Sequence, residues 1–158
     1  MKREQKSLTN KGFSLVELII VVAIMAVLIG VLAPQYLRYV EKTRLQRDNT
    51  SISDFANVLK IAATEEKVNS EIATAAATFK FSGTPLAAQA SGSTNLDAEV
   101  GLTVNLGDIT LTSNTYTKQT NLPEVTVKVD STTGIVTVEC SNWIDTPNGT
   151  PSATPKKF

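Results

Sequence analysis

The most prominent feature of the chain is a long apolar segment close to its start. Residues 13–33 are twenty-one positions in which only Ser14 and Glu17 carry polar side chains. A helix of that length covers about 30 Å at the standard rise of about 1.5 Å per residue, which matches the hydrocarbon thickness of a bilayer. The pattern predicts a membrane-spanning helix over residues 13–34.

A helical period continues beyond this segment. Apolar residues recur at spacings near 3.6 across residues 35–67, at Leu37, Val40, Leu45, Ile52, Phe55, Leu59 and Ala62. We therefore expect one helix over about residues 14–67, with an amphipathic second half that faces a domain. Gly30 and Pro34 should kink or open it, because proline lacks an N–H and its ring clashes with the carbonyl one turn back.

The period changes in the remainder of the chain. Residues 68–100 are rich in Ala, Ser and Thr, which predicts a variable loop region with a short helix near 70–78 and loops around 83–85 and 91–93. Residues 144–158 are Pro- and Thr-rich and lack periodicity. We expect them to form an extended, partly mobile tail.

Between these regions, residues 101–143 alternate between apolar and polar positions. The alternation predicts four short antiparallel strands, near 102–106, 109–111, 125–129 and 136–140. Gly107-Asp108 and Asp130–Gly134 are the expected turns. A small sheet with one apolar face needs a cover, which the amphipathic helix supplies. The predicted fold class is α+β, a long N-terminal helix packed on a small antiparallel β-sheet.

Charge and composition exclude several functions. Fifteen basic residues balance fifteen acidic ones, so no overall basic field favours a dedicated polynucleotide binder. The sequence has no histidine and one cysteine, Cys140, which excludes histidine-based catalytic triads, histidine-ligated metal sites and an intrachain disulfide. We predict no catalytic residue, cofactor or metal site.

The charges are unevenly distributed around the apolar segment. The first twelve residues contain four basic residues and one acidic residue, a net charge of +3, which leaves −3 for the rest. A basic flank resists translocation, so the N-terminus should stay in the cytoplasm and the C-terminal domain should lie outside.

Two conventional interpretations of the apolar segment compete. A cleaved secretory signal has an apolar region of about 7–15 residues, which is shorter than the segment here, and Pro34 would directly follow its cut. A plain single-pass anchor fits the length but gives no reason for Glu17, because an ionisable group costs about 2–3 kcal/mol at mid-membrane.

The residues Lys11-Gly12-Phe13-Ser14-Leu15-Val16-Glu17-Leu18, followed by the apolar run, resemble the class III signal of type IV prepilins. The likeness is close over residues 11–67 and only architectural beyond. It implies that a prepilin peptidase cuts after Gly12 on the cytoplasmic side, removes the leader 1–12 and methylates the new amine of Phe13. It also implies that Glu17 of an incoming subunit neutralises the Phe13 amine of a neighbour and sets its axial register.

By this resemblance the chain is a structural protein without enzymatic activity or cofactor. It would be the major subunit of a type IV pilus, polymerising through Phe13–Val31 into a surface filament. Its partners would be sister subunits, the prepilin peptidase, and the pilus assembly platform with its ATPase machinery. The precursor would lie in the cytoplasmic membrane. The alternatives are a minor pilin or pseudopilin of a secretion or competence system, and a single-pass membrane-anchored binding domain.

The remaining cysteine, aromatic and acidic residues have predictable surroundings. Cys140 shares a strand face with Val136 and Val138, so we expect a small buried hydrophobe, although many type IV pilins close a loop near the C-terminus with a disulfide. The aromatic residues Phe13, Tyr36 and Tyr39 should pack between neighbouring helices. The acidic residues Glu65, Glu66 and Glu71 lack a ligand loop and should form a solvated helix surface.

Overall fold

The computed structural model describes residues 12–82, 86–91, 94–103 and 105–158. The chain divides into two units, Met1–Leu37 and Arg38–Phe158, and the second, called the head below, contains the sheet. Most of the predicted leader, and the predicted loop positions 83–85 and 92–93, lie outside the described residues.

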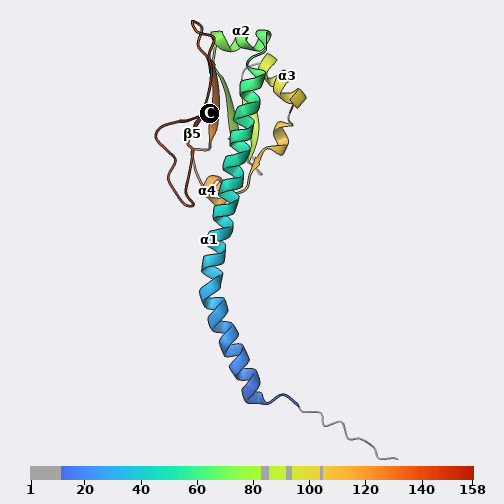
Figure 1. Ribbon diagram of the computed structural model, residues 1–158, viewed down its shortest axis with the longest axis vertical. Helices are drawn as coiled ribbons and strands as arrows, with labels where there is room; N and C mark the ends of the chain where they lie inside the picture. Colours follow the sequence, from blue (N-terminus) through green and yellow to red (C-terminus); the bar gives the residue numbers. More distant parts are fainter. Residues whose placement is uncertain (1–11, 83–85, 92–93, 104) are drawn as a thin grey trace, which may run out of the picture. The chain divides into compact units, whose positions relative to one another are not determined.

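One helix, α1 (Leu15–Ala62), contains both the apolar and the amphipathic segment (Figure 1). The prediction that it continues to residue 67 is wrong. The last carbonyls of α1 accept i→i−3 bonds, from the Thr64 N–H to Ile61 (3.0 Å) and from the Glu65 N–H to Ala62 (3.3 Å), which closes the helix in a tight turn.

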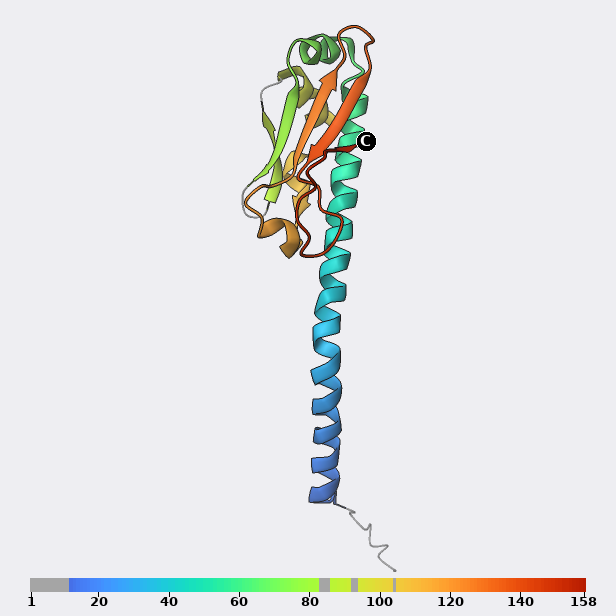
Figure 2. The same ribbon diagram turned by 90° about the vertical axis from the view of Figure 1, so that its left-hand side faces the viewer.

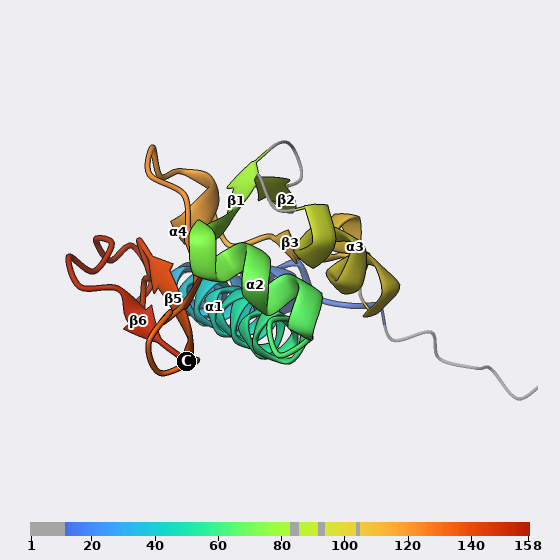
Figure 3. The same cartoon turned by 90° about the horizontal axis from the view of Figure 1, so that it is seen from above.

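A second helix, α2 (Glu66–Thr74), follows this turn and lies across the end of α1 (Figure 3). The Asn69 side-chain amide donates to the Ala63 carbonyl at 3.2 Å, which satisfies an acceptor at the end of α1. Val68 and Ile72 are buried, so α2 closes the core from this end. The short helix expected near 70–78 thus exists, displaced towards the N-terminus.

The sheet has six antiparallel strands in the order β3-β2-β1-β4-β5-β6 (Figure 2). Its four longer strands are β1 (Ala77–Ser82), β2 (Leu86–Ser91), β4 (Glu124–Val129) and β5 (Val136–Ser141), and its two-residue strands are β3 (Thr110–Leu111) and β6 (Lys156–Lys157). The remaining elements are α3 (Thr94–Thr103), a 3₁₀ turn at Leu106–Asp108 and α4 (Asn114–Thr117). The α+β architecture agrees with the prediction and is consistent with a pilin-like fold.

The core lies between α1 and one face of the sheet. The Phe55 ring of α1 meets the rings of Phe79 and Phe81 on β1 edge-on, with centroids 5.3 and 6.4 Å apart. Val125 pairs with Cys140 and Val127 with Val138 across β4 and β5, and all four are fully buried. Aromatic pairs in this geometry add about 0.5–1.5 kcal/mol beyond their burial.

Two predictions between residues 77 and 106 are wrong. The region expected to be a loop contains β1 and β2, and β1 buries Phe79 and Phe81 by simple alternation. The strand expected near 102–106 is replaced by the end of α3 and the 3₁₀ turn. Leu96 and Val100 explain this difference, because both are fully buried and lie one helical turn apart.

The predicted turn between β4 and β5 is confirmed. Gly134 has φ of +70°, a conformation that glycine adopts without strain. The Asp130 carboxylate accepts hydrogen bonds from the N–H groups of Thr132 (2.8 Å) and Thr133 (2.9 Å). These bonds lower the pKa of Asp130, because they favour the ionised carboxylate. The turn expected at Gly107-Asp108 is instead the 3₁₀ element.

The C-terminal residues return to the sheet, which the sequence analysis did not predict, while the expected mobility of the tail stays a prediction. β6 pairs with β5, and the Phe158 N–H donates to the Val138 carbonyl at 3.0 Å. The Phe158 ring meets Trp143 edge-on at 5.7 Å, and the Lys156 ammonium lies 3.9 Å from the Trp143 ring centre. Strand pairing, ring packing and a cation–π contact together fix the tail to the sheet edge.

Candidate functional site

The start of α1 is organised by Ser14 and Glu17. Ser14 precedes the first helical residue, Leu15, and its N–H donates to a Glu17 carboxylate oxygen at 3.4 Å. The Leu18 N–H donates to the Ser14 carbonyl at 3.2 Å. A glutamate that reaches back from the third helical position is half of a capping box, which the pattern Ser-x-x-Glu encodes. Our sequence analysis missed this role of Ser14, although the signal is present.

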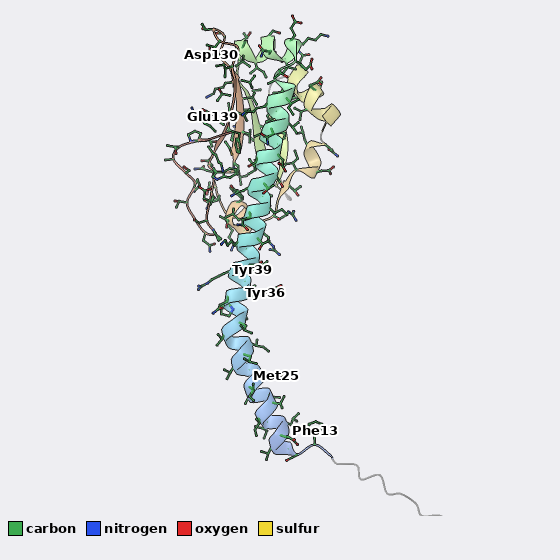
Figure 4. The ribbon with its side chains drawn as sticks, in the orientation of Figure 1. Phe13, Met25, Tyr36, Tyr39, Asp130 and Glu139 are labelled. Carbon is green, nitrogen blue, oxygen red and sulfur yellow. The ribbon has the colours of Figure 1, made fainter. Side chains whose placement is uncertain are left out.

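The predicted cleavage junction lies just before this cap. Gly12, Phe13 and Ser14 are exposed and precede the helix without regular secondary structure. Phe13 is 85% exposed, and Figure 4 shows its side chain projecting from the start of α1. A Cβ added to Gly12 would meet no atom within 4 Å. A peptide bond that is exposed and outside regular secondary structure is accessible to a protease, and in this uncleaved chain the Phe13 nitrogen is still an amide.

The apolar segment of α1 is uncovered along its length. Its large apolar side chains from Phe13 to Leu32 are 43–85% exposed, and the side chain of Met25 projects freely in Figure 4. This part of α1 is long and apolar enough to cross a membrane. Soluble proteins rarely expose a contiguous apolar surface of this size, so the segment requires lipid or another protein surface around it.

The surface of this segment contains a shallow apolar hollow. It is lined by Ala23, Ile24, Val27 and Leu28. Ala23 with Val27, and Ile24 with Leu28, form two neighbouring i, i+4 ridges, and the hollow lies in the groove between them. Such grooves accept the ridge of a second helix.

Farther along, α1 passes through Gly30 and Pro34 as a helix. A Cβ added to Gly30 would meet no atom within 4 Å, so nothing in the subunit itself requires glycine there. The kink or opening expected at this position stays a prediction.

Within the head, α1 is attached by a polar network that our sequence analysis missed. Asp48 is fully buried, and its carboxylate accepts from the N–H groups of Thr112 (2.9 Å) and Ser113 (2.7 Å) and from the Thr112 hydroxyl (3.3 Å). One Glu41 oxygen accepts from the N–H (2.7 Å) and the hydroxyl (2.8 Å) of Thr115. The two acids thus bind N–H groups at the start of α4, where anionic groups are favoured.

The network extends to Asn49. Its side-chain amide donates to the Ile144 carbonyl at 2.9 Å and accepts from the Tyr116 hydroxyl at 2.6 Å. Burial strongly raises the pKa of Tyr116, so this phenol remains a neutral donor. The signal for the network was three polar residues within the apolar stripe of an amphipathic helix, but their partners are about 65 or more positions away in the sequence.

The remaining residues of interest are one buried cysteine, two exposed glutamates and two exposed tyrosines. Cys140 is a buried free thiol, as expected, and burial raises its pKa to about 12. Glu65 and Glu66 are exposed, and no group of acidic and cysteine residues in the described ranges has the geometry of a metal site. Tyr36 and Tyr39 are 66% and 69% exposed, so their packing between neighbouring helices stays a prediction.

Comparison with known proteins identifies the N-terminal region. Residues 8–33 match the prokaryotic N-terminal methylation motif. No curated protein and no solved structure matches the chain significantly. The motif and the exposed apolar helix support membrane anchoring of a precursor that a prepilin peptidase processes in the context of pilus assembly. The chain carries the class III signal peptide of type IV pilins, which supports a type IV pilin-like or pseudopilin precursor with a structural role.

Proposed function

We propose that this chain is the major subunit of a type IV pilus. The precursor lies in the cytoplasmic membrane with its N-terminus inside and its head outside. A prepilin peptidase removes residues 1–12 and methylates Phe13, and the assembly platform with its ATPase then inserts the subunit into a growing filament. The observation that carries the proposal is the combination of the methylation motif at residues 8–33 with an apolar helix that the subunit leaves wholly uncovered.

The uncovered helix has a surface on which a sister helix can pack. Like the grooves of other helices, the hollow between Ala23, Ile24, Val27 and Leu28 can accept a ridge of a sister helix. In lipid, helix association is driven by packing and polar contacts because lipid tails are as apolar as leucine. A contact that repeats by rotation and rise without closing generates a filament.

Glu17 supplies the polar contact in this proposal. Cleavage converts the Phe13 amide into a cationic amine, and a carboxylate in a low-dielectric layer gains most from such a partner. The Glu17 carboxylate has about four acceptor positions, so the bond with the Ser14 N–H leaves capacity for the amine of a neighbour. A buried pair of this kind tends to set register more than it adds stability.

Three variants separate the charge of Glu17 from its capping role. Glu17→Gln keeps an oxygen that can accept from the Ser14 N–H but removes the charge, whereas Glu17→Ala removes both. Ser14→Ala serves as the control at the helix start. We expect cleavage in all three, and shorter or fewer pili in both Glu17 variants. Normal pilus length and yield in Glu17→Gln would contradict the charge-based register.

A second experiment separates the major-subunit role from its alternatives. Fibres sheared from cells should contain this chain as the principal band. Its presence as a trace component, or only in a secretion or competence machine, would identify a minor pilin or pseudopilin. A single-pass anchored binding domain would keep its leader and appear in no fibre.

A further inference from the structure

Four basic residues of α1 follow closely after the apolar segment. Arg38, Lys42, Arg44 and Arg47, called the basic collar here, are all exposed. Arg38 is five positions beyond Ala33, the last residue of the apolar run. The collar therefore begins where the helix leaves the hydrocarbon layer.

Two acidic residues, Glu41 and Asp48, lie in the same stretch, so residues 38–48 carry four basic and two acidic side chains and a net charge of +2. Glu41 is bound to Thr115, and Asp48 is bound to Thr112 and Ser113. In the described part of the chain, no collar residue forms a salt bridge with any carboxylate. The head thus holds both acids by hydrogen bonds, with Oε2 of Glu41 buried and unpartnered among the described residues, and the exposed cations with their net charge of +2 are available to an external anion.

The distances along the helix indicate which collar residues can reach the phosphate groups of a membrane. At about 1.5 Å per residue, Arg38 lies about 7.5 Å and Lys42 about 13.5 Å beyond Ala33. The headgroup layer extends roughly 5–8 Å beyond the hydrocarbon, and surface charge acts over a further Debye length of about 8 Å. Both side chains therefore lie within reach of lipid phosphates, while Arg44 and Arg47 lie in the screened region beyond.

An exposed tyrosine lies between these two cations. Tyr39 is 69% exposed, and Figure 4 shows its side chain pointing away from α1. Tyrosine is enriched at the membrane–water interface because its ring is amphipathic. We propose that Arg38 and Lys42 of the basic collar bind the phosphate groups of anionic phospholipids in the leaflet next to the head while the subunit is membrane-anchored. This rests on the anchoring in the proposed function but not on polymerisation.

The test uses the full-length precursor in vesicles of phosphatidylcholine with a minor fraction of phosphatidylglycerol. The protein is extracted in mild detergent, and native mass spectrometry gives the ratio of the two lipids that remain bound. The test variant is Arg38→Gln/Lys42→Gln. The matched control is Lys60→Gln/Lys67→Gln, which removes the same charge from α1 and α2 in the head.

Each basic side chain near an anionic surface contributes about fivefold to binding at low salt. We expect the wild type and the control to enrich phosphatidylglycerol, and the Arg38/Lys42 variant to lose roughly twentyfold of that enrichment. Raising the salt concentration should reduce enrichment more in the wild type and the control than in this variant, in which the basic residues of the leader still contribute a salt-dependent attraction.

Two outcomes would overturn the proposal. The first is no preference for phosphatidylglycerol in the wild type, and the second is equal enrichment in the variant and the control. If the second outcome accompanied a loss of pili in the variant, the collar would instead bind an acidic surface of another subunit. Failure of the pilin assignment is distinguishable, because an unprocessed anchored chain would still show the lipid preference without forming pili.

Discussion

Replacement of Asp48 by alanine tests whether the polar network attaches α1 to the head. Asp48 is fully buried, and its carboxylate accepts three hydrogen bonds from Thr112 and Ser113. The substitution leaves the buried Ser113 N–H without an acceptor, and Thr112, which is exposed, can turn to water. An unsatisfied buried donor costs about 1–3 kcal/mol, and hydrogen bonds to a charged group contribute about 1.5–3 kcal/mol. We expect Asp48→Ala to lower the free energy of unfolding by about 2–4 kcal/mol.

Asp48→Asn should give about half that loss, because its amide oxygen still accepts a hydrogen bond but without the charge. The matched control is Asp54→Ala, one exposed acid farther along the same helix, which should change the stability by less than about 0.5 kcal/mol.

Denaturant unfolding of the full chain in detergent micelles measures these differences. The single tryptophan of the sequence, Trp143, is 3% exposed in the head, so its fluorescence reports head unfolding. A loss in Asp48→Ala no larger than in Asp54→Ala would refute the role of the buried acid. It would also weaken the inference that the cations of the basic collar lack an internal partner.

Three further changes test other parts of the account. Gly30→Ala should stabilise α1 by about 1 kcal/mol, since its Cβ meets open space, and circular dichroism measures this effect. The same substitution should lower the number of pili per cell if the filament needs a close helix approach or an opened helix at residue 30. A normal number of pili would contradict that need. Phe158→Ala removes the ring contact with Trp143 and should cost about 1–2 kcal/mol in urea unfolding, whereas an unchanged midpoint would mean that the tail does not stabilise the sheet. Desolvation, and then the neighbouring Glu71, raise the pKa of Asp97, so its stabilising protonated form is lost as pH rises through that pKa. Asp97→Asn should therefore raise the melting temperature at pH 7 and leave it unchanged near pH 3, and an equal effect at both pH values would exclude ionisation as the cause.

The long helix and the second half of the sheet could be predicted because their signals are local. Residues 13–33 are apolar throughout, and β4 and β5 alternate around a turn marked by Asp130 and Gly134. The end of α1 could not be predicted, because the stretch from Ala62 to Glu66 contains neither glycine nor proline. The turn there is instead stabilised by the Asn69 side chain and by the burial of α2.

Our secondary-structure predictions for the first half of the head were wrong where a helical spacing and a strand alternation overlap in the sequence. Leu96 and Val100 follow a helical spacing, while Leu102, Val104 and Leu106 alternate, and the buried helical pair decided the structure of α3. β1 was missed because the alanine-rich composition around it obscured the alternation at Phe79 and Phe81.

The residues of the candidate site also differ in how directly the sequence indicates them. Gly12, Phe13 and Glu17 belong to a contiguous motif that the sequence displays directly. The contacts of Asp48 and Glu41 join positions 64 and 74 residues apart, and no local pattern encodes such pairs. Only the fold shows that these acids accept hydrogen bonds from the head and that, within the described ranges, the cations of the basic collar form no salt bridge.

The central claim is that the apolar helix becomes an assembly element once its cytoplasmic end is processed. Intact-mass and fragment mass spectrometry of this protein, isolated from cells and from sheared surface fibres, tests that claim most directly. We predict a chain that begins at Phe13 and carries one methyl group on its α-amine, recovered from the fibres. A protein that begins at Met1, or that is found only as separate subunits in the membrane fraction, would contradict the account.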